Sequence, residues 1–599
     1  MHAYAGKILR IDLTKKKIKK QELKEEFAKK YIGGRGFGAK IIWDEVENVE
    51  PYDPKNKVVI SSGPLAGTFL AGAGKTSFVS KSPLTYGYGD SNMGGHFACE
   101  MKYAGYDSIV IEGRSKKPTW IKIENENVEF KNAEHLWGKN SFETEKEIKK
   151  EFDGEVAVIG QGGENLVRYA CITSDCGRQA GRAGIGAVFG SKALKGIGIF
   201  GDKDITIADY KKFFSESRKL FKDCFSSANL KPWQKYGTAQ VVTWASEIEA
   251  LPTKNFLYGT YENAEKISGE AMVEKCVKMN KACFACPMAC GKYSYTKKYD
   301  KYVEGAEYET IALLGSNCGL EDIEDVVYAN YLCDAYGIDT ISTGNIIAFV
   351  MDCSKNDLID EKINFGDANK MFELIRKIAF RERIGKILAE GVRYASEKFN
   401  ASKYAVHIKG MEQSGYESRA APAMALSYMT CDVGAHHNRS WAITHDIKVG
   451  RDEIEGKAEK VIELQHIRPM FDMLGVCRLQ WVELNVDLES YAKLFSYATG
   501  WDYKLNDLLF ASERIYNLTR AYWFREVKDF GRSYDYPPEK YSSEVEKGKT
   551  KGYKIEKKIA DKLLDKYYGL RGWDSEGKPK KEKLISLDLE YVIGKIYED

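Results

Sequence analysis

Apolar and polar positions alternate along much of the first 210 residues, a pattern typical of β-strands. The stretch "KILRIDLTKKKIKKQEL" alternates around a Lys-rich turn and therefore predicts a hairpin. Further short strands closed by turn residues are expected in "KVVISSGPLAG", "DSIVIEG", "TWIKIENENVEF" and "EVAVIGQGG". The first part of the chain is therefore predicted to be rich in β-structure.

From about residue 210 onward the hydrophobic period shifts to that of helices. In "LEDIEDVVYANYLCDAYG" one helix face would carry Ile323, Val326, Val327 and Tyr331. Gly337 follows and is suited to end that helix. The last 60 residues are Lys-rich and amphipathic, so we expect a solvated helical end there. We place the domain boundaries near 210 and 410, which gives units 1–210, 211–410 and 411–599.

Composition narrows the class of protein. A chain of 599 residues is too long for one core, so several domains are expected. Lys and Arg number 90 against 87 Asp and Glu, a net charge of +3, which argues against nucleic acid as the main partner. No apolar run reaches the roughly 18 residues of a membrane span, and the N-terminus lacks the apolar core of a signal peptide. We expect a cytoplasmic protein whose 13 cysteines stay reduced and available for metals.

Two glycine-rich stretches, 72–97 and 176–196, have more Gly and Ser than packing requires. Glycine lets the backbone approach a ligand and present its N–H groups to an anion. "GAGKTS" lacks the upstream Gly of a Walker A loop, and "GRAGIG" lacks the order of a dinucleotide fingerprint. Either stretch could be a plain surface turn. The alternative is a glycine-lined surface on which Lys75, Asn92 and Arg182 hold phosphates or a polar heterocycle.

Three thiols are clustered in "CFACPMAC": Cys283, Cys286 and Cys290. Zinc sites usually pair two such knuckles, and no second knuckle follows. Cubane iron–sulfur clusters commonly take three clustered thiolates and a remote one. A chance grouping is the third interpretation.

A fourth thiol is suggested by two similar stretches, "DAYGIDTIS" and "DMLGVCRLQ", which share the pattern Asp-x-x-Gly-aliphatic. Each follows a helical segment that would end at its glycine, Gly337 or Gly475, and each alone is explained as an ordinary helix C-cap. Together they indicate two similar sockets for two similar polar ligands. In the second, Cys477 takes the place of Asp339, which makes it the candidate fourth ligand.

Along nearly its whole length the chain resembles the tungsten-containing aldehyde:ferredoxin oxidoreductase family. The resemblance is carried, in this order, by "YIGGRGFGAKIIWDE", "SGPLAGT", "KSPLTYGYGDSNMGGHF", "MKYAGYDSIVIEG", "AGRAGIGAVFGSKALKGIGI", "CFACPMAC", "GAEYETIALLGSN", "DAYGIDTIS", "GAHHNRS" and "DMLGVCRL". It implies an α+β protein in which a β-rich N-terminal domain forms a base for a pterin cofactor and two mainly helical domains follow.

The resemblance also implies the cofactors. These are a tungsten (or molybdenum) bis-pterin, one [4Fe-4S] cluster and, as a further candidate, a magnesium ion bridging the pterin phosphates. The metal takes its sulfur ligands from the pterins, not from a side chain. The cluster ligands would be Cys283, Cys286, Cys290 and Cys477.

The residues implied to contact the pterins come from both parts of the chain. The N-terminal part would supply Lys75, Asn92, Gly94, Arg182, Ala183 and Gly184. The helical part would supply Asp334, Ile338 and Asp339 for one pterin, Asp472 and Val476 for the other, and Arg439 as a basic contact. Lys75 stands where the family has Arg, so it keeps a charge but loses bidentate geometry toward a phosphate.

The family's acid and base near the metal are a Glu and a His. The Glu lies in "AEYET" and is Glu307 or Glu309, with Glu307 favoured. The His is His437 of "GAHHNRS", which aligns better than His436. Without the motif context, a Glu on a helix face would be taken as solvated and a His as a core contact.

The implied reaction is the reversible oxidation of a small aldehyde to its carboxylate, with electrons leaving through the cluster to ferredoxin or a ferredoxin-like iron–sulfur subunit. One rival is the reduction of an aromatic acyl thioester by a catalytic subunit of a larger complex. Another is a non-catalytic electron-relay subunit with a cluster and no pterin. No His lies between 135 and 407, so the Glu-x-x-His pair that bridges subunits through iron in some members is missing. A homodimer would therefore lack a bridging iron.

Overall fold

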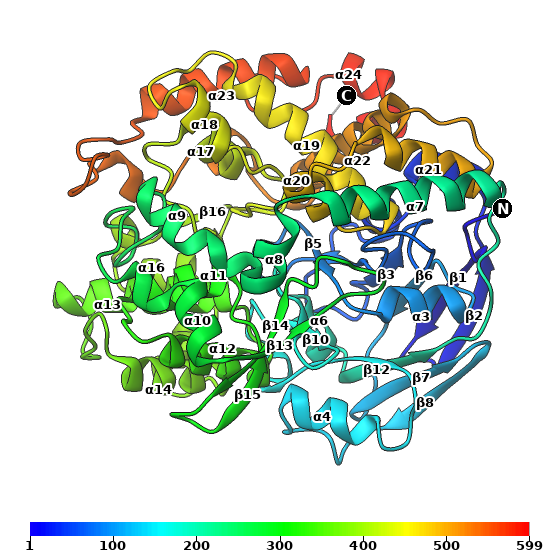
Figure 1. The fold of residues 1–599 in the computed structure, drawn as a ribbon, viewed down its shortest axis with the longest axis horizontal. Coiled ribbons are helices and arrows are strands. Elements are labelled where there is room, and N and C mark those ends of the chain that lie inside the picture. Colours follow the sequence, from blue (N-terminus) through cyan, green and yellow to red (C-terminus); the bar gives the residue numbers. More distant parts are fainter. Residues whose placement is uncertain (598–599) are drawn as a thin grey trace.

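The computed structural model describes residues 1–597, and in it β-structure dominates the first 200 residues and helices the rest. Figure 1 shows the N-terminal sheets (blue and cyan) on the right, the middle of the chain (green) on the left and the C-terminal helices (yellow to red) across the top. The predicted α+β class, with a β-rich part followed by helices, is confirmed.

The first sheet has six strands in the order β2-β1-β6-β3-β4-β5. Their bounds are β1 Lys7–Asp12, β2 Lys17–Glu22, β3 Val58–Ser62, β4 Thr76–Lys81, β5 Tyr88–Met93 and β6 Ser108–Glu112. The predicted Lys-rich hairpin is the antiparallel pair β1–β2, and β1 runs parallel to β6 on its other side. Strands β3 and β4 are buried throughout, and α2 (Arg35–Glu45) packs on them.

The second sheet has the order β11-β10-β9-β12-β7-β8. Its strands are β7 Thr119–Glu124, β8 Asn127–Asn132, β9 Glu155–Val158, β10 Ile172–Ser174, β11 Arg178–Ala180 and β12 Leu194–Phe200. The stretch "TWIKIENENVEF" forms two of them, because the chain turns at Asn125, whose φ is +53°.

The middle of the chain is mainly helical. Its principal helices are α7 Tyr210–Ser226, α8 Leu230–Tyr236, α9 Val241–Glu247, α10 Gly269–Lys275, α12 Ile323–Tyr336, α13 Thr340–Lys355, α14 Ala368–Ala379 and α16 Val392–Lys398. A small antiparallel sheet interrupts them, formed by β13 Val277–Lys281, β14 Gly291–Thr296 and β15 Lys301–Glu304. The loop between β13 and β14 carries the three clustered cysteines.

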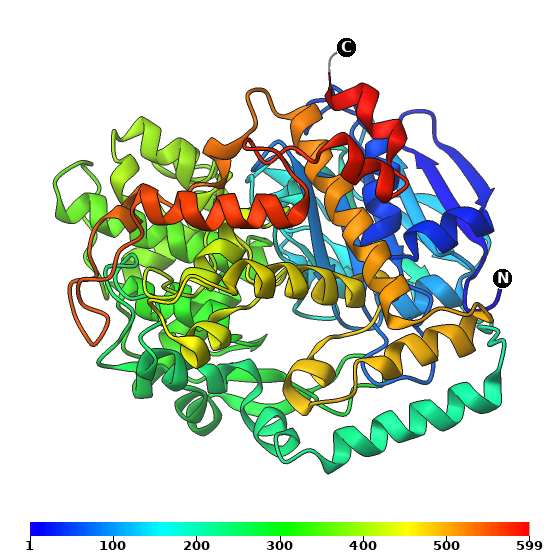
Figure 2. The same cartoon turned by 90° about the horizontal axis from the view of Figure 1, so that it is seen from above.

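The C-terminal helices include α17 Pro422–Thr430, α18 Ile443–Val449, α19 Lys457–Leu474, α20 Leu479–Leu484, α21 Glu489–Thr499, α22 Leu505–Glu526 and α23 Lys557–Arg571. Seen from above, α19 (yellow) lies between α22 (orange) and α23 (orange-red) (Figure 2), and it packs against both. Helix α7 packs along α21, so segments nearly 300 residues apart in sequence lie side by side (Figure 1).

The prediction of a merely solvated helical end was wrong for its inner face. Tyr567 and Arg571 of α23 are buried, and both donate to Oε1 of Gln465 in α19, at 2.5 and 2.7 Å. Because two donors satisfy one buried amide oxygen, this end of the chain is fixed to the core.

Helices α12 and α19 end where the sequence predicted. Gly337 and Gly475 follow them in the left-handed region, with φ of +69° and +79°, which a residue with a Cβ adopts only under strain.

Each of these helix ends lies against a glycine that follows a strand of one of the two large sheets. Gly160, beyond β9, meets the end of α12, where a Cβ would lie 2.5 Å from the carbonyl of Tyr336. Gly63, directly after β3, meets the end of α19, where a Cβ would overlap the carbonyl of Leu474. Both helices can therefore approach the β-rich part only because these two positions lack side chains.

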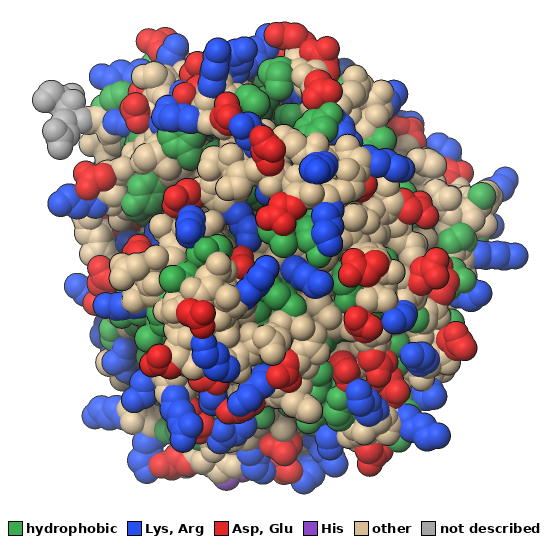
Figure 3. All heavy atoms as spheres, turned by 90° about the vertical axis from the view of Figure 1, so that its left-hand side faces the viewer, with side chains coloured by type: hydrophobic (Ala, Val, Ile, Leu, Met, Phe, Trp, Pro, Cys, Tyr) green, Lys and Arg blue, Asp and Glu red, His purple; other side chains and the backbone are tan. Residues whose placement is uncertain are grey.

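The surface carries mixed charge. Over the face shown in Figure 3, Lys and Arg side chains are interspersed with Asp and Glu. Within residues 1–597, no helix is long and apolar enough to cross a membrane.

The Gly63 contact predicts that Gly63→Ala destabilises the protein by about 1–3 kcal/mol, the usual range for overpacking a buried contact, because the end of α19 must move away from β3. Chemical denaturation monitored by tryptophan fluorescence measures the effect. Gly569→Ala is the matched control, because a Cβ there meets nothing within 4 Å and Ala favours the helix. An equal loss in both variants would contradict the prediction.

Candidate active site

The loop at the end of α12 (residues 334–339, the first loop) and the loop at the end of α19 (residues 472–477, the second loop) close in the same way. The backbone N–H of Ile338 donates to the carbonyl of Cys333 at 2.9 Å, and that of Val476 donates to the carbonyl of Phe471 at 3.2 Å. In both cases the acceptor lies five residues back, as in the Schellman motif. The similarity of the two sequence stretches thus corresponds to a repeated geometry.

Both loops also bind the β-rich part through the equivalent residue. The N–H of Asp339 donates to the carbonyl of Tyr169, and that of Cys477 donates to the carbonyl of Gly72, each at 3.0 Å. The substitution of Cys for Asp in the second loop therefore places a thiol where the first loop has a carboxylate.

The carboxylates of the first loop are buried and engaged. Asp339 caps α13 by accepting from two of its backbone N–H groups, and it also accepts from Nε of Arg182 at 3.2 Å. Asp334 accepts from Gln179 at 3.1 Å, and burial raises the pKa of Asp334 well above its ordinary value. A neutral Asp334 would be able to donate a hydrogen bond as well as accept one.

Arg182 ties this loop to the helical part of the chain. Besides Asp339, its guanidinium donates to the carbonyls of Glu412 at 2.6 Å and Ala435 at 3.0 Å and to Oγ of Ser414 at 3.1 Å. These protein contacts use four of its five donors, so Arg182 fixes the wall of the site; whether it also contacts a pterin stays a prediction.

The second loop ends in a network of buried charges. Arg439 donates to Asp472 at 3.3 Å, to Asp432 at 2.8 Å and to Asp90 of β5. Arg35 of α2 donates to Asp90 at 3.0 Å and to Asp432. All five side chains are buried, with relative exposures of 3% or less. Oδ1 of Asp472 is buried and has no hydrogen-bond partner among the described residues.

Three predicted pterin contacts come from the first sheet: Asn92 in β5, Gly94 directly after β5 and Lys75 directly before β4. Asn92 accepts from Ser77 at 2.6 Å, and Gly94 faces Cys283, whose Sγ would lie 2.8 Å from a Cβ at this glycine. Lys75 is half-buried, and its N–H donates to the carbonyl of Gly475 at 3.1 Å.

Ala183 and Gly184, which precede α6 (Ile185–Ser191), both have positive φ, +67° and +72°. The N–H of Arg182 donates to Oγ of Ser91 at 3.1 Å, which holds this turn against β5. The backbone of the turn thus lies between the first loop and the first sheet.

The fourth predicted thiol joins the other three. Burial and the neighbouring Cys477 and Cys283 raise the pKa of Cys286 to about 12, and Gln480 donates to Sγ of Cys286 at 3.4 Å. All 13 cysteines are free. Among residues 1–597 no three His, Cys, Asp or Glu side chains could hold a single metal ion. The three clustered thiols and the more remote Cys477 form the kind of set that cubane clusters commonly take.

Arg178 lies beside these thiols and was missed by the sequence interpretation. Burial opposes its charge, but Cys283, Glu304 and Cys290 raise the pKa of Arg178 well above its ordinary value. Its guanidinium pairs with Glu304 at 2.9 Å, and its Nε has no hydrogen-bond partner among the described residues.

The predicted acid and base meet in the structure as Glu309 and His437. Nδ1 of His437 lies 3.1 Å from Oε1 of Glu309, but the two atoms are not aligned for a hydrogen bond, and both are buried without one. Oε2 of Glu309 accepts from the N–H of Gly415 at 2.6 Å, which orients the carboxyl. Burial raises the pKa of Glu309 to about 7.

His437 is kept neutral by its surroundings. Burial and the positive charges of Arg478, Arg468 and Arg182 lower the pKa of His437 well below its ordinary value. Of the two groups, the Glu309 carboxyl, with a pKa near 7, is the one that can gain or lose a proton near neutral pH.

Glu307, which the sequence favoured, lies elsewhere. It accepts from the hydroxyl of Thr238, and its charge contributes to raising the pKa of Cys290. The structure thus brings Glu309, not Glu307, to His437 and leaves Glu307 on the side of the thiols. The neighbouring His436 is buried and accepts from the N–H of Asn438 at 3.3 Å.

The arrangement fits the implied cofactors. Buried polar atoms without partners among the described residues face the two loops and the thiols: Oδ1 of Asp472, Nε of Arg478, Nε of Arg178, Oε1 of Glu309 and Nδ1 of His437. Buried polar groups are rarely left unpaired, so their gathering here indicates a polar ligand. Glycines 72 and 94 leave room beside Cys477 and Cys283 that a Cβ would fill.

Several residues of the site escaped the sequence interpretation. Arg35 and Asp90 lie within stretches that carried the family resemblance, but nothing in their spacing indicates that they meet. Asp432 interrupts the apolar run "SYMTCDVGA", and Arg468 interrupts the buried face of α19. A charged residue within a segment that is otherwise apolar and buried could have indicated these positions, because such a charge needs a partner.

Comparison with family models places most of the chain in one family. A model described as "Aldehyde ferredoxin oxidoreductase, N-terminal domain" matches residues 8–201, and one described as "Aldehyde ferredoxin oxidoreductase, domains 2 & 3" matches residues 215–589.

Individual relatives are similar over nearly their whole length. The tungsten-containing aldehyde ferredoxin oxidoreductase of Pyrococcus abyssi is 38% identical over 99% of this chain and 100% of its own. The aliphatic sulfonate oxidoreductase, WOR-like subunit, of Pyrococcus furiosus is 30% identical over 98% of this chain and 97% of its own. Among solved structures, the active site complex BamBC of benzoyl coenzyme A reductase with 1,5-dienoyl-CoA is similar at a TM-score of 0.86 and 25% identity, covering 99% of this chain and 98% of that chain.

The buried carboxyl of Glu309 predicts a pH-dependent stability. Its folded pKa of about 7 exceeds the ordinary 4.5, so the folded state retains a proton that the unfolded state releases. Stability should fall as pH rises from 4.5 to 7, by up to about 3 kcal/mol. Glu309→Gln should remove this loss and raise the unfolding midpoint at pH 8, measured by calorimetry between pH 5 and 8. Glu307→Gln keeps Glu309 and should keep the wild-type slope. A Glu309→Gln slope equal to that of the wild type would refute the assignment.

Proposed function

Because the chain belongs to the aldehyde ferredoxin oxidoreductase family, we propose that it is a tungsten–bis-pterin enzyme that oxidises an aldehyde to its carboxylate. The electrons would pass through a [4Fe-4S] cluster to ferredoxin or a ferredoxin-like subunit. The observation that carries this proposal is the buried Glu309–His437 pair, whose carboxyl lies near Arg182 and near Asp339 of the first loop.

In this proposal the residues divide among three groups. Asp334, Ile338 and Asp339 would hold one pterin, and Asp472 and Val476 the other. The walls between the two loops would be formed by Lys75, Asn92, Gly94, Arg182, Ala183, Gly184 and Arg439. Cys283, Cys286, Cys290 and Cys477 would bind the cluster. The tungsten bis-pterin, when bound, would supply the two-electron chemistry, and the cluster would transfer electrons singly.

The chain's own groups would handle protons. Conversion of an aldehyde and water into a carboxylate releases two electrons and three protons. Glu309, with a pKa near 7, can accept a proton at Oε1. His437 stays neutral, so it can orient that proton by a hydrogen bond from the ring nitrogen that faces Oε1. The N–H of Gly415 holds the other carboxyl oxygen, so Oε1 is the one free to react.

The thiols would stand next to the second pterin, because Cys477 lies one residue beyond Val476 in the same loop. Arg178 places a positive charge beside Cys283 and Cys290, which would stabilise the negative charge of a thiolate-bound cluster. A magnesium ion between the pterin phosphates, the choice of tungsten over molybdenum and a dimer without bridging iron stay predictions, as do the domain boundaries at 210 and 410.

A second candidate reaction is the reduction of an aromatic acyl thioester. It is favoured by the similarity to the active site complex of benzoyl coenzyme A reductase over 99% of the chain. The aldehyde is preferred because relatives at up to 38% identity are named for aldehyde oxidation. An electron-relay subunit, the candidate from another class, predicts iron without tungsten or pterin.

The proposal predicts the composition and activity of the purified protein. It should contain tungsten or molybdenum with two pterins per chain, and about four irons per chain as expected for one cubane. It should reduce a viologen dye with benzaldehyde as donor, and Glu309→Gln and His437→Asn should each lower kcat by about 100-fold or more, the usual contribution of a general acid or base. Turnover of benzoyl-CoA but not of aldehydes would favour the second candidate, and iron without pterin would favour the relay subunit.

The fourth ligand can be tested separately. Cys477→Ser should lose the spectrum of an intact reduced [4Fe-4S] cluster in electron paramagnetic resonance and lower the iron content. Cys176→Ser, which removes an exposed free cysteine outside the cluster, should leave both unchanged. A full cluster in Cys477→Ser would show that another residue is the ligand.

A further inference from the structure

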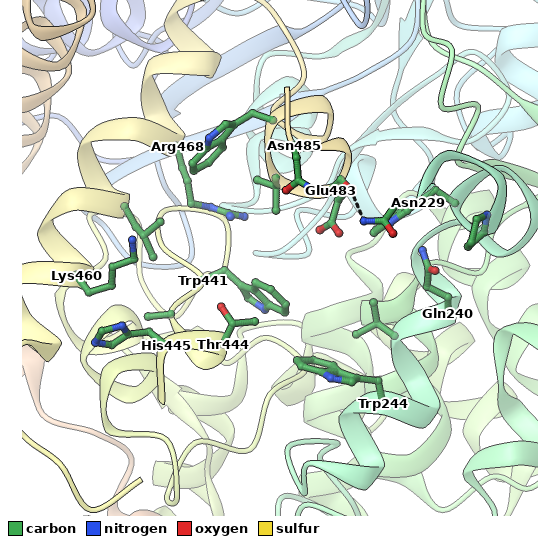
Figure 4. A pocket seen from close by; sticks show the side chains of 17 residues that line it. Asn229, Gln240, Trp244, Trp441, Thr444, His445, Lys460, Arg468, Glu483 and Asn485 are labelled. Atoms are coloured by element: carbon green, nitrogen blue, oxygen red, sulfur yellow. Dashed lines mark hydrogen bonds between the residues drawn. The ribbon is translucent and has the colours of Figure 1, made fainter. Parts of the chain in front are cut away.

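A cavity of about 820 Å³ opens between α8, α9, α19 and α20. Figure 4 shows its rim and walls. The polar side chains of Asn229, Thr444 and Asn485 stand at the exposed rim, and Arg468 lies at its inner side. The volume lies within the range of small-molecule sites.

Tryptophan rings supply much of the wall. Trp244 of α9 and Trp441, four residues after His437, lie with ring centroids 5.9 Å apart at 42°. Trp233 and Trp481 also line the cavity. Flat apolar surfaces of this kind suit a planar aromatic body, since ring pairs at such distances attract each other.

Arg468 is a buried cation without a carboxylate partner. It is 6% exposed, and its Nε donates to the carbonyl of Asn438 at 3.1 Å. Among the described residues no carboxylate lies within ion-pair distance of it. Burial and the nearby charge of Arg478 lower the pKa of Arg468 to about 9, although the more distant Glu483 and Asp472 act in the opposite direction. In Figure 4 its guanidinium points into the cavity, toward the same space as the rings of Trp244 and Trp441. A buried unpaired guanidinium of this kind calls for an anion.

The cavity borders the aromatic residues that pack against the Glu309–His437 pair. Trp441 packs against Tyr416 with centroids 5.8 Å apart, and Tyr416 packs against His437 at 6.2 Å. Arg468 binds the backbone next to His437 through Asn438. A molecule in the cavity would thus be separated from the acid/base pair by a single aromatic layer.

We propose that this cavity selects aromatic aldehydes that carry a carboxylate, with Arg468 as the residue that recognises the carboxylate. The proposal rests on the proposed aldehyde oxidation and names its substrate class. The ring would lie against Trp244 and Trp441, and two guanidinium N–H groups of Arg468 would bind the carboxylate.

Glu483 limits the class to monoanions. Its carboxyl points into the same space in Figure 4, and burial raises its pKa. A second negative charge on the ligand would meet this carboxyl, which would have to stay protonated. A phosphate ester or a dicarboxylate should therefore bind less well than a single carboxylate.

The test compares 4-formylbenzoate with benzaldehyde in the wild type, Arg468→Gln and Arg468→Lys. Arg468→Gln should raise KM for 4-formylbenzoate by about tenfold to a hundredfold, as expected for a lost charge-assisted pair. Because the charge of Arg468 also lowers the pKa of His437, a change in kcat should be the same for both substrates. KM for benzaldehyde should change by less than about threefold, and Arg468→Lys should recover most of the loss in KM for 4-formylbenzoate. Lys370→Gln, which removes a positive charge on α14 that pairs with Glu373, is the control for net charge.

Binding is measured independently of turnover with 4-(hydroxymethyl)benzoate, an alcohol that keeps the carboxylate, and with neutral benzyl alcohol, both by titration calorimetry on the purified holoenzyme. The carboxylate should bind more tightly than the neutral alcohol, and Arg468→Gln should abolish that difference. Equal affinity of the two alcohols in the wild type, or an unchanged preference in Arg468→Gln, would overturn the assignment of Arg468. Absence of activity on both aldehydes would count against the proposed oxidation, while the calorimetry would still decide whether the cavity recognises the carboxylate.

Discussion

The buried network of Arg35, Asp90, Asp432, Arg439 and Asp472 is the constraint on which the rest of the site depends. It joins α2 and β5 of the β-rich part to three segments of the C-terminal part. A buried charge is strongly destabilising unless an opposite charge pairs with it. The β-rich part and the C-terminal part must therefore pack in the relative position that keeps all five charges paired. Arg439 lies two residues from His437, and Asp472 begins the second loop. The network therefore positions His437 and the second loop together.

A smaller version of the same arrangement holds the first loop. Arg182, from the turn after β11, pairs with Asp339, much as Arg439 pairs with Asp472. In both, a helix ends at a glycine in the left-handed region and contacts a glycine beyond a strand of a large sheet. The two loops differ in the residue that follows the aliphatic position. In the first loop, the carboxylate of Asp339 caps α13. In the second, the thiol of Cys477 lies near Cys286. The same backbone geometry thus places a capping carboxylate in the first loop and a thiol in the second.

The sequence sufficed wherever a local rule applied. Gly337 and Gly475 could be placed because helix ends require positive φ, and the two loops could be matched because they repeat the same local pattern. Glu309 could not be distinguished from Glu307, because the choice depends on a short helical turn that directs residues two positions apart to opposite sides, one to His437 and one to the thiols. Arg468 and the tryptophan cavity depend on α9 lying across the cavity from α19 and α20, a long-range arrangement that no local pattern contains. The same holds for the partners of Arg35.

The net charge of +3 gives no indication that several arginines gather at the site. Arg178, Arg468 and Arg478 all face it, and each has donors or a charge that the described residues only partly satisfy. Burial, together with the charges of Arg478, Arg468 and Arg182, explains why His437 stays neutral. Glu309, by contrast, keeps a raised pKa because burial outweighs the attraction of Arg182. A site of this kind disfavours cations and favours anions, as the proposed phosphate-bearing cofactors, thiolate-bound cluster and carboxylate product would require. The donors that these arginines leave without a protein partner are therefore best understood as contacts for such ligands.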